Sequence, residues 1–186
     1  MNKPTKSLII ESPTHGTFKV LYDAEDEDKI NKHTWHVKKD SNRDKFYVCT
    51  RISHPSHDWY YPPNHGRQRR KTSLFLHQLI MVTPKGMATD HINGDGLDNR
   101  KQNLRICTHA ENLRNRRLGK NNTSGYKGVS WHKLHKLWYA HISHNKKLMS
   151  LGYFKDKEEA AKAYDRKAIE LFGEFAKLNF PIEDYQ

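Results

Sequence analysis

The chain has 186 residues and a formal net charge of +12, because 33 Lys and Arg residues outnumber 21 Asp and Glu residues. Hydrophobic residues make up only 35% of it, which fits two modest cores better than one large core. No run approaches the roughly 20 apolar residues that a membrane span needs, and the start has no signal-peptide pattern, so we expect a cytosolic protein. The two cysteines, Cys49 and Cys107, are too few for a cysteine-rich zinc site.

The positive charge is unevenly distributed along the chain. Residues 112–155 hold ten Lys or Arg residues and no acid, whereas residues 156–174 hold six acids and four bases. A surplus of this size predicts a polyanionic partner, either nucleic acid or an anionic membrane surface. The contrast between the two stretches favours a shaped nucleic-acid-binding face followed by an ordinary solvated helix.

The first half of the chain predicts short strands and helices. Residues 54–71 form a breaker-rich loop whose basic tail, Arg67, Arg69, Arg70 and Lys71, is either a solvated loop or part of a binding site. The apolar residues 73–82 fit a strand or a helix equally well. The other expected elements are strands at 17–23, 46–52 and 87–92 and a helix at 26–35.

The second half continues with a loop at 93–103, a strand at 104–107 and a helix at 108–117, in which Thr108 and Glu111 form a capping box. Three strands follow in 126–154, and then a helix that Asp156 caps and Gly173 ends. We therefore expect an α+β protein with a domain at 1–118, a linker at 119–125, and a small domain at 126–182. The small domain would be a three-stranded antiparallel sheet packed on one helix.

The segment "DHINGDGLDNRKQNLRICTHAEN", residues 90–112, brings together the groups that phosphodiester hydrolysis needs. Asp90 offers a charged oxygen to a hard metal ion at a strand end, and Asn112 offers a neutral one. His91 points to the other side of the strand and can take a proton from water. Asn103 suits hydrogen bonds that hold the loop. A structural loop rich in Asn and Asp is the alternative, whereas a calcium loop fails because Ile92 occupies its third position.

This segment resembles the HNH nuclease motif of phage and intron-associated homing endonucleases over residues 74–117. The resemblance implies a ββα-metal fold, with Asp90 and Asn112 as ligands of Mg²⁺ or Mn²⁺, His91 as the general base and Asn103 as the residue that fixes the loop. It also implies a bacterial or phage-infected host cytoplasm. His77 resembles a recurrent histidine upstream of the motif, without an assigned role.

Residues 124–180 resemble the ethylene-response-factor (Apetala-two) DNA-binding domain, through "YKGV", "LGYF" and "EEAAKAYDRKAIELFGEFAKLNF". That family lays its sheet in the DNA major groove. Few of the matching positions are Arg, the residue suited to guanine, so we expect a looser or different readout. Trp138 is expected in the core. The DNA-binding residues predicted from the sheet are Lys127, Ser130, His132, Lys133, Lys136, His141, Ser143, Leu148 and Ser150, and those from the preceding helix are Arg114 and Arg117.

Together, the two resemblances predict a homing-type HNH endonuclease that cleaves or nicks double-stranded DNA. We expect it to act as a monomer without an obligate protein partner. A DNA-binding regulator with an inactive nuclease fold is the alternative. RNA binding or cleavage is less favoured, because the small domain lacks the aromatic sheet pattern of RNA-recognition folds.

Overall fold

The computed structural model describes residues 3–41, 45–53, 71–115, 118 and 121–185, together with the backbone of 59–60 and 68–69. The chain divides into two compact units, Met1–His109 and Ala110–Gln186. The division falls ahead of the linker expected at 119–125. Within the described ranges, no helix is both long and apolar enough to cross a lipid bilayer.

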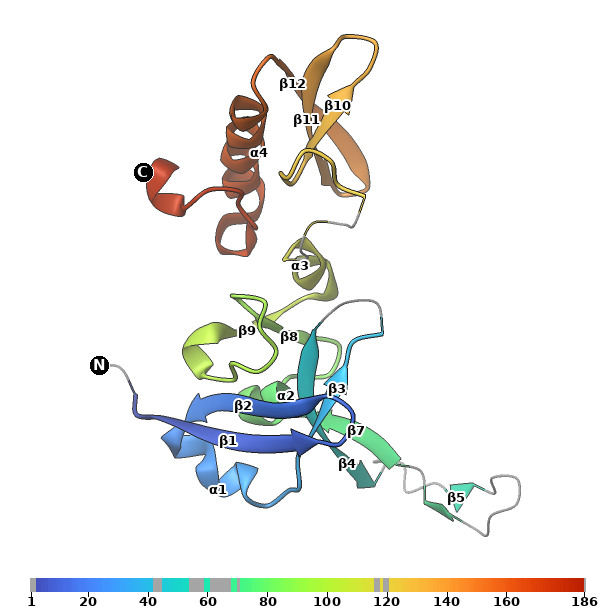
Figure 1. Cartoon of the computed structure of the whole chain (residues 1–186), viewed down its shortest axis with the longest axis vertical. Coiled ribbons are helices and arrows are strands. Elements are labelled where there is room, and N and C mark those ends of the chain that lie inside the picture. The colour runs from blue at the N-terminus through green and yellow to red at the C-terminus, as the bar shows by residue number, and fades with distance from the viewer. Residues whose placement is uncertain are drawn as a thin grey trace. The chain divides into compact units, whose positions relative to one another are not determined.

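The first unit is built from small antiparallel sheets (Figure 1). A hairpin pairs β1 with β2, a second sheet has the order β3-β4-β7, and β8 pairs with β9. The strands are β1 (Thr5–Ser12), β2 (Gly16–Asp23), β3 (His36–Lys39), β4 (Phe46–Ser53), β5 (Trp59–Tyr60), β6 (Gln68–Arg69), β7 (Lys71–Phe75), β8 (Ala88–His91) and β9 (Leu104–Cys107). The helices are η1 (Ala24–Asp26), α1 (Glu27–Ile30), α2 (Leu76–Met81) and η2 (Lys101–Asn103).

One hydrophobic core joins these elements. Val20 of β2, Ile30 of α1, Val48 of β4, Leu76 of α2 and Leu104 of β9 are buried together in it. Each comes from a different element, so removing these side chains from water holds the hairpins against one another. The β8–β9 hairpin is therefore fixed to the rest of the unit through β9.

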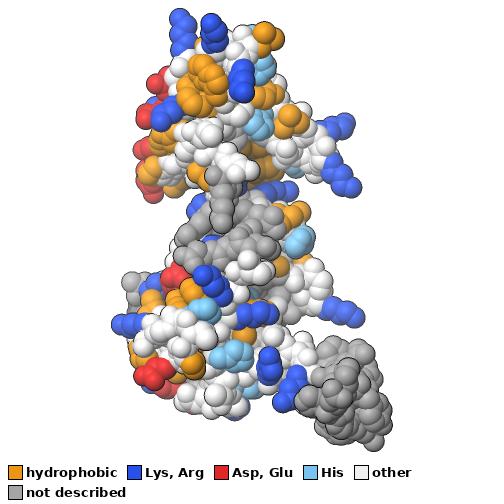
Figure 2. Space-filling model, turned by 45° about the vertical axis from the view of Figure 1, so that its right-hand side comes forward, with side chains coloured by type: hydrophobic (Ala, Val, Ile, Leu, Met, Phe, Trp, Pro, Cys, Tyr) orange, Lys and Arg blue, Asp and Glu red, His pale blue; other side chains and the backbone are white. Residues whose placement is uncertain are grey.

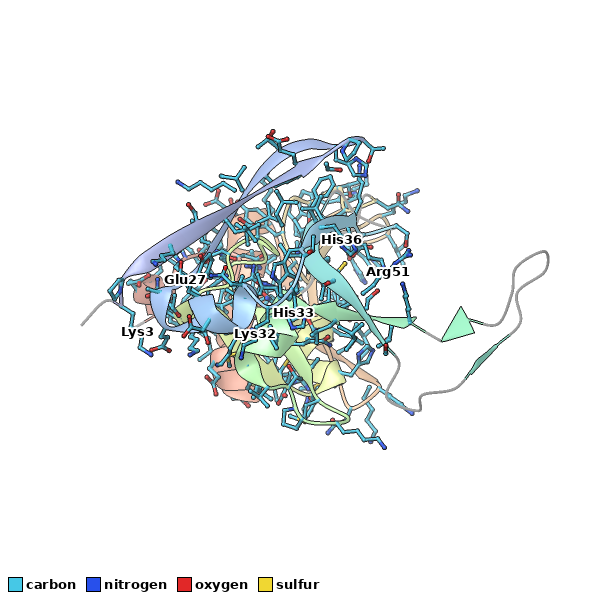
Figure 3. All side chains as sticks on the ribbon, turned by 90° about the horizontal axis from the view of Figure 1, so that it is seen from below. Lys3, Glu27, Lys32, His33, His36 and Arg51 are labelled. Atoms are coloured by element: carbon cyan, nitrogen blue, oxygen red, sulfur yellow. The ribbon has the colours of Figure 1, made fainter. Side chains whose placement is uncertain are left out.

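Charged side chains tie the N-terminal hairpin to the elements that follow it. Lys3 pairs with Glu25 at 2.8 Å, and Lys6 pairs with Glu27 of α1. Figure 3 shows Lys3 and Glu27 near the same end of the hairpin. Lys101, in the loop between β8 and β9, also pairs with Glu25 and donates its backbone N–H to Asp23 at 2.8 Å. The N-terminal hairpin thus supports the loop that holds the candidate site.

The second unit contains α3, which begins at the last residue of the first unit, and an antiparallel sheet of order β10-β11-β12. Ala160 and Ala161 of the long helix are fully buried with Val129 and Ala140 of the sheet. Small side chains at these positions let the helix lie close to the strands. The elements are α3 (His109–Arg114), β10 (Val129–His132), β11 (Leu137–His144), β12 (Lys147–Phe154), α4 (Lys157–Phe172), η3 (Gly173–Phe175) and η4 (Ile182–Tyr185).

Two local features explain the motifs of this unit. Asp156 caps α4 by accepting from the backbone N–H groups of Glu158 and Glu159 at 2.6 and 3.1 Å, as predicted. Gly128, the glycine of "YKGV", has φ +73°, and a Cβ there would lie 1.9 Å from the Tyr164 ring. Only glycine fits both the backbone conformation and the space. In Figure 2, the acidic side chains of this unit gather along one side.

The mixed α/β class with small antiparallel sheets is confirmed. The helix predicted over 26–35 is wrong in extent, because α1 ends at Ile30 and the Trp35 indole N–H donates to the Ile30 carbonyl at 2.8 Å. Residues 73–82 contain both alternatives, the end of β7 and then α2. The strands β1 and β3 were not predicted, and the loop predicted over 54–71 contains the short strands β5 and β6. Arg67, Arg70 and Arg117 lie outside the described residues, as do the side chains of residues 59–60 and 68–69.

Candidate functional site

The β8–β9 hairpin positions two adjacent polar residues of the motif. Its register pairs Asp90 with Arg105 and His91 with Leu104. Successive side chains of a strand point to opposite faces, so Asp90 and His91 face different surroundings. Both are almost fully buried, with 7% and 5% of their surfaces exposed. Buried polar groups need hydrogen-bond partners, and Asp90 and His91 each have partners on their own side of the strand.

Asp90 is held by Arg105. The guanidinium donates to Oδ2 of the carboxylate from Nε at 3.1 Å and from Nη2 at 2.9 Å. This cation balances the charge of a carboxylate that burial alone would disfavour. An ion that bound Asp90 would therefore share its carboxylate with Arg105 or displace the guanidinium.

The donor set around Asp90 fits a weak site for a hard cation rather than a dedicated cage. Within the described part of the chain, no three His, Cys, Asp or Glu side chains are grouped to hold a metal ion. Mg²⁺ commonly takes only one or two protein carboxylates and fills its other positions with water and substrate phosphate. A single buried carboxylate at a strand end matches that pattern, with an amide oxygen such as that of Asn112 as the predicted second ligand.

His91 lies on the other side of β8, among aromatic rings. Its ring centroid is 4.9 Å from that of His77, which meets it edge-on at 78°, and 6.0 Å from that of Tyr47. Its Nε2 lies 3.3 Å from Oδ1 of Asn99. Burial lowers the pKa of His91, although the hydrogen bond with Asn99 raises it in part. The neutral imidazole, which is the form that accepts a proton, is thus favoured.

His77 is neutral as well. Burial, with a smaller effect of His91, lowers the pKa of His77 to about 3. Its Nδ1 is buried and has no hydrogen-bond partner among the described residues. Phe75 stacks on His77 with ring centroids 5.4 Å apart. His77, on which Phe75 stacks, is therefore an uncharged neighbour of His91.

Asn103 lies in η2 and holds the loop between the two strands. Its Oδ1 accepts from the backbone N–H of Asn93 at 3.0 Å, and its Nδ2 donates to Oδ1 of Asn93 at 3.0 Å and to the carbonyl of Asp98 at 2.8 Å. The backbone of Ile92 also donates to the Asn103 carbonyl at 2.8 Å. One buried side chain thus closes the loop that follows His91. Its part in catalysis stays a prediction.

The predicted residues of α3 belong to the second unit. Asn112 is half-buried there, and its role as a metal ligand stays a prediction. The Arg114 guanidinium lies 4.3 Å from the Phe172 ring centroid. The backbone carbonyl of Arg114 accepts a hydrogen bond from Nζ of Lys127. Burial lowers the pKa of Lys127 to about 8. Arg114 and Lys127 thus make packing contacts within the unit.

The outer face of the second sheet, defined by Ser130, Tyr139, His141, Ser143 and Tyr153, lies opposite α4. The register pairs Ser130 with Tyr139, and Tyr139 with Tyr153. Tyr139 stacks on both His141 and Tyr153, with centroids 5.1 and 5.0 Å apart. The register also places two residues of β12 on this face: Ser150 pairs with His141, and Leu148 pairs with Ser143.

The turn at the end of this face carries its cations. Lys133 and Lys136 are exposed there, and His135 stacks on His132 with centroids 4.6 Å apart. The structure thus places most of the predicted DNA-binding residues of the sheet on one face or its adjoining turn, with Lys127 the exception. Trp138 packs into the core, as expected.

Four residues of these sites were missed by sequence reasoning: Asn99, Arg105, His135 and Tyr153. The pairing of Arg105 with Asp90 could have been found from the sequence, because the hairpin register places this basic residue, two positions after Asn103, opposite Asp90. The position of Tyr153 could not have been found in this way, because the register shift between Ala140 and His141 moves Tyr153 to the outer face.

Comparison with known proteins matches both parts of the chain. Residues 83–114 match the family model described as HNH endonuclease, and residues 124–174 match the AP2 domain. Protein 3.8 of Escherichia phage T7 is 37% identical over 95 residues, which are 51% of this chain and 78% of that protein. An uncharacterized HNH endonuclease, L560, of Acanthamoeba polyphaga mimivirus is 32% identical over 129 residues, 65% of this chain and 66% of that protein. APETALA2-like protein 2 of Oryza sativa subsp. indica is 38% identical over 71 residues, 38% of this chain but only 16% of that protein.

These matches define the class: the chain combines an HNH endonuclease domain with an AP2 DNA-binding domain, as predicted. It belongs to the family of Protein 3.8 of phage T7, of whose length it spans more than two thirds. In contrast, it spans only a small part of the plant proteins, so their activities are not transferred to it.

Proposed function

We propose that the protein is a metal-dependent, homing-type HNH endonuclease that cuts or nicks double-stranded DNA, with its AP2 domain holding the target. The observation that carries the proposal is the pair Asp90 and His91. The two residues are adjacent and buried, and they occupy opposite sides of β8, one as a carboxylate beside a cation and one as a neutral imidazole. Hydrolysis of a phosphodiester needs both groups in this separation of roles.

In this mechanism His91 takes a proton from a water molecule as the water oxygen attacks phosphorus. Only 5% of the His91 surface is exposed, so a water molecule bound at its ring would be largely shielded from bulk solvent. Shielding strengthens the electrostatic interactions on which the step depends. The rings of His77 and Tyr47, which contact His91, orient its imidazole without adding a charge that would compete for the proton.

Asp90, with Asn112 as the proposed second ligand, would hold Mg²⁺ or Mn²⁺. When bound, such an ion supplies positive charge to the crowded phosphate and to the leaving 3′ oxygen. Arg105 lies against Asp90, so its guanidinium would lie close to a phosphate held at this site and would donate a charge-assisted hydrogen bond to it. Arg105 thus pairs with the Asp90 carboxylate without DNA and would add a cation to the site with DNA.

The outer face of the second sheet is the proposed DNA contact. Serine and tyrosine hydroxyls and imidazoles can hydrogen-bond base edges, whereas the exposed Lys133 and Lys136 suit phosphates. Connecting this domain to the nuclease raises the effective concentration of the nuclease at the bound DNA. We propose that the protein acts on DNA as a monomer in the cytoplasm of an infected host cell.

The first test is conversion of supercoiled plasmid to open-circle or linear DNA, with Mg²⁺ and with EDTA. The wild type should cut only with the metal ion, and His91→Ala should lose cutting while its DNA affinity changes little. His15→Ala is the matched control, because His15 is an exposed histidine of the same unit. Cutting by His91→Ala at the wild-type rate would contradict the assignment of the base. Tight binding without metal-dependent cutting, on plasmids carrying varied host DNA, would instead support a DNA-binding regulator.

A second test concerns the DNA contact alone. Replacing Lys133 and Lys136 together by alanine should weaken binding and lower the slope of log affinity against log salt by about 0.9 for each phosphate that the protein no longer binds. Lys162→Ala is the control, since Lys162 lies on α4 and pairs with Glu159 at 3.4 Å. An unchanged slope in the double variant would mean that this turn does not bind DNA.

A further inference from the structure

The outer face of the second sheet is built from hydroxyl, imidazole and apolar side chains, whereas exposed lysines stand in the two turns that flank β11. Lys133 and Lys136 lie in the turn before β11, and Lys146 and Lys147 lie in and beside the turn after it. With eight residues, β11 is about 25 Å long, which is twice the roughly 12 Å width of the DNA major groove. Cations at both ends of the face can therefore reach phosphates on the two sides of a groove, with the uncharged centre over the base edges.

Leu148 is the aliphatic side chain at one end of this centre, and 61% of its surface is exposed. Its cross-strand partner is Ser143 of β11, and the next outward residue of β12 is Ser150. Both serines are small and exposed. A flat group such as the edge of a base pair can therefore approach Leu148 over its neighbours.

Packing within the domain does not account for a leucine at this position. Met149 and Leu151, on the two sides of Ser150 in β12, face the other way and pack against the core residues Ile142 and Tyr164. Leu148 alternates with them and faces the solvent, where apolar surface is unfavourable. A serine would serve the fold equally well here, so the reason for a leucine lies in what the outer face contacts.

Double-stranded DNA offers an apolar group that fits such a side chain. The 5-methyl group of thymine lies in the major groove, and apolar side chains contact it there. Guanine, in contrast, is read mainly by Arg or Lys, and neither residue belongs to the outer face. Serine hydroxyls can hydrogen-bond to any base, so the choice of base at this end of the face falls to Leu148.

We propose that Leu148 contacts the 5-methyl group of thymine, so that the outer face selects A·T base pairs where Leu148 meets the DNA. This proposal rests on the DNA contact proposed above and adds the base that the contact reads.

Uracil in place of thymine tests this directly, because it removes the methyl group and keeps the hydrogen-bonding edge of the base. The probes are an alternating A·T duplex two helical turns long and the same duplex with every thymine replaced by uracil. Alternation presents a methyl group in every register, so the target sequence need not be known. Fluorescence anisotropy of the full chain in EDTA measures binding without cleavage. The wild type should bind the thymine duplex about three- to fivefold more tightly, as expected when one methyl group is buried.

Leu148→Ser should bind the two duplexes equally and about as weakly as the wild type binds the uracil duplex. Its melting temperature should be unchanged, because the side chain is exposed. Ile182→Ser is the matched control, since Ile182 is an exposed apolar residue of η4, whose Tyr185 hydroxyl donates to Asp165 of α4. This variant should keep the preference for thymine.

Three results would overturn the thymine contact while the DNA contact itself stands. They are equal binding of both duplexes by the wild type, a thymine preference that persists in Leu148→Ser, and tighter binding of an alternating G·C duplex than of the A·T duplex. A preference that persists in Leu148→Ser would assign the effect of the methyl group to the shape of the DNA. Failure of the wild type to bind any of the duplexes at low salt would refute the DNA contact and the thymine contact together.

Discussion

Replacing Asp165 by alanine should unfold the AP2 domain far more readily. Asp165 is a fully buried carboxylate in α4 that accepts from four donors of the C-terminal segment. These donors are the backbone N–H and the Nδ2 of Asn179 at 2.9 Å each, the backbone N–H of Phe180 at 3.0 Å and the Tyr185 hydroxyl at 2.8 Å. Asn179 in turn accepts from the Lys127 N–H at 2.7 Å and donates to its carbonyl. One carboxylate therefore connects α4, the tail and the start of the sheet.

The size of the effect follows from these hydrogen bonds. A hydrogen bond to a charged group contributes about 1.5–3 kcal/mol, but desolvation of the carboxylate offsets part of the total. Removing a buried ion that several donors satisfy costs about 3–5 kcal/mol, and we expect that decrease in stability for Asp165→Ala. Tyr185→Phe removes one donor and should cost about 1–2 kcal/mol. Asp184 precedes Tyr185 in the sequence and is exposed, so Asp184→Ala should change the stability by less than about 0.5 kcal/mol.

Amide hydrogen exchange of the full chain measures this locally. The free energy of opening should fall for β11 and α4 in Asp165→Ala, while that of β4, in the other unit, serves as the internal reference. For a unit of this size, each kcal/mol also lowers the melting temperature by about 4–8 °C, so the calorimetric transition of the domain should drop by at least about 12 °C. If Asp165→Ala matches Asp184→Ala in both measurements, the reasoning about the buried carboxylate is wrong.

Two further predictions concern the nuclease unit. Gly96→Ala should slow plasmid cleavage at least tenfold and leave DNA affinity unchanged. A Cβ at this position would lie 2.7 Å from the ring of Tyr47, and that ring contacts His91, the proposed general base. Single-turnover rates test this, and a wild-type rate would mean that the loop moves aside without disturbing the site. Arg105→Gln should tighten Mn²⁺ binding several-fold in the DNA-free protein, because it removes the guanidinium that pairs with the Asp90 carboxylate. Titration calorimetry measures the affinity, and weaker binding would show that Arg105 prepares the metal site instead of competing for it.

Local signals were enough to predict the elements that carry the motifs. The alternation in 104–107 predicted β9, and Asp156 followed by a helical apolar pattern predicted α4 and its cap. The order of Asp90, His91 and Asn103 within one hairpin could also be predicted, because turn chemistry and strand alternation act over a few residues. These same properties placed Asp90 and His91 on opposite sides of their strand.

The sequence by itself therefore determined the two families that the chain combines and the candidate residues of the proposed hydrolytic site. Only the tertiary structure decided which groups surround them. Asn99 reaches His91 because its loop pairs with Leu21, nearly eighty residues earlier, and no local propensity encodes such a contact. Tyr153 faces outward because the register shift near Ala140 reverses the alternation of β12. Contacts between distant segments and irregularities of register depend on how the whole chain packs, and they set the partners of each functional side chain.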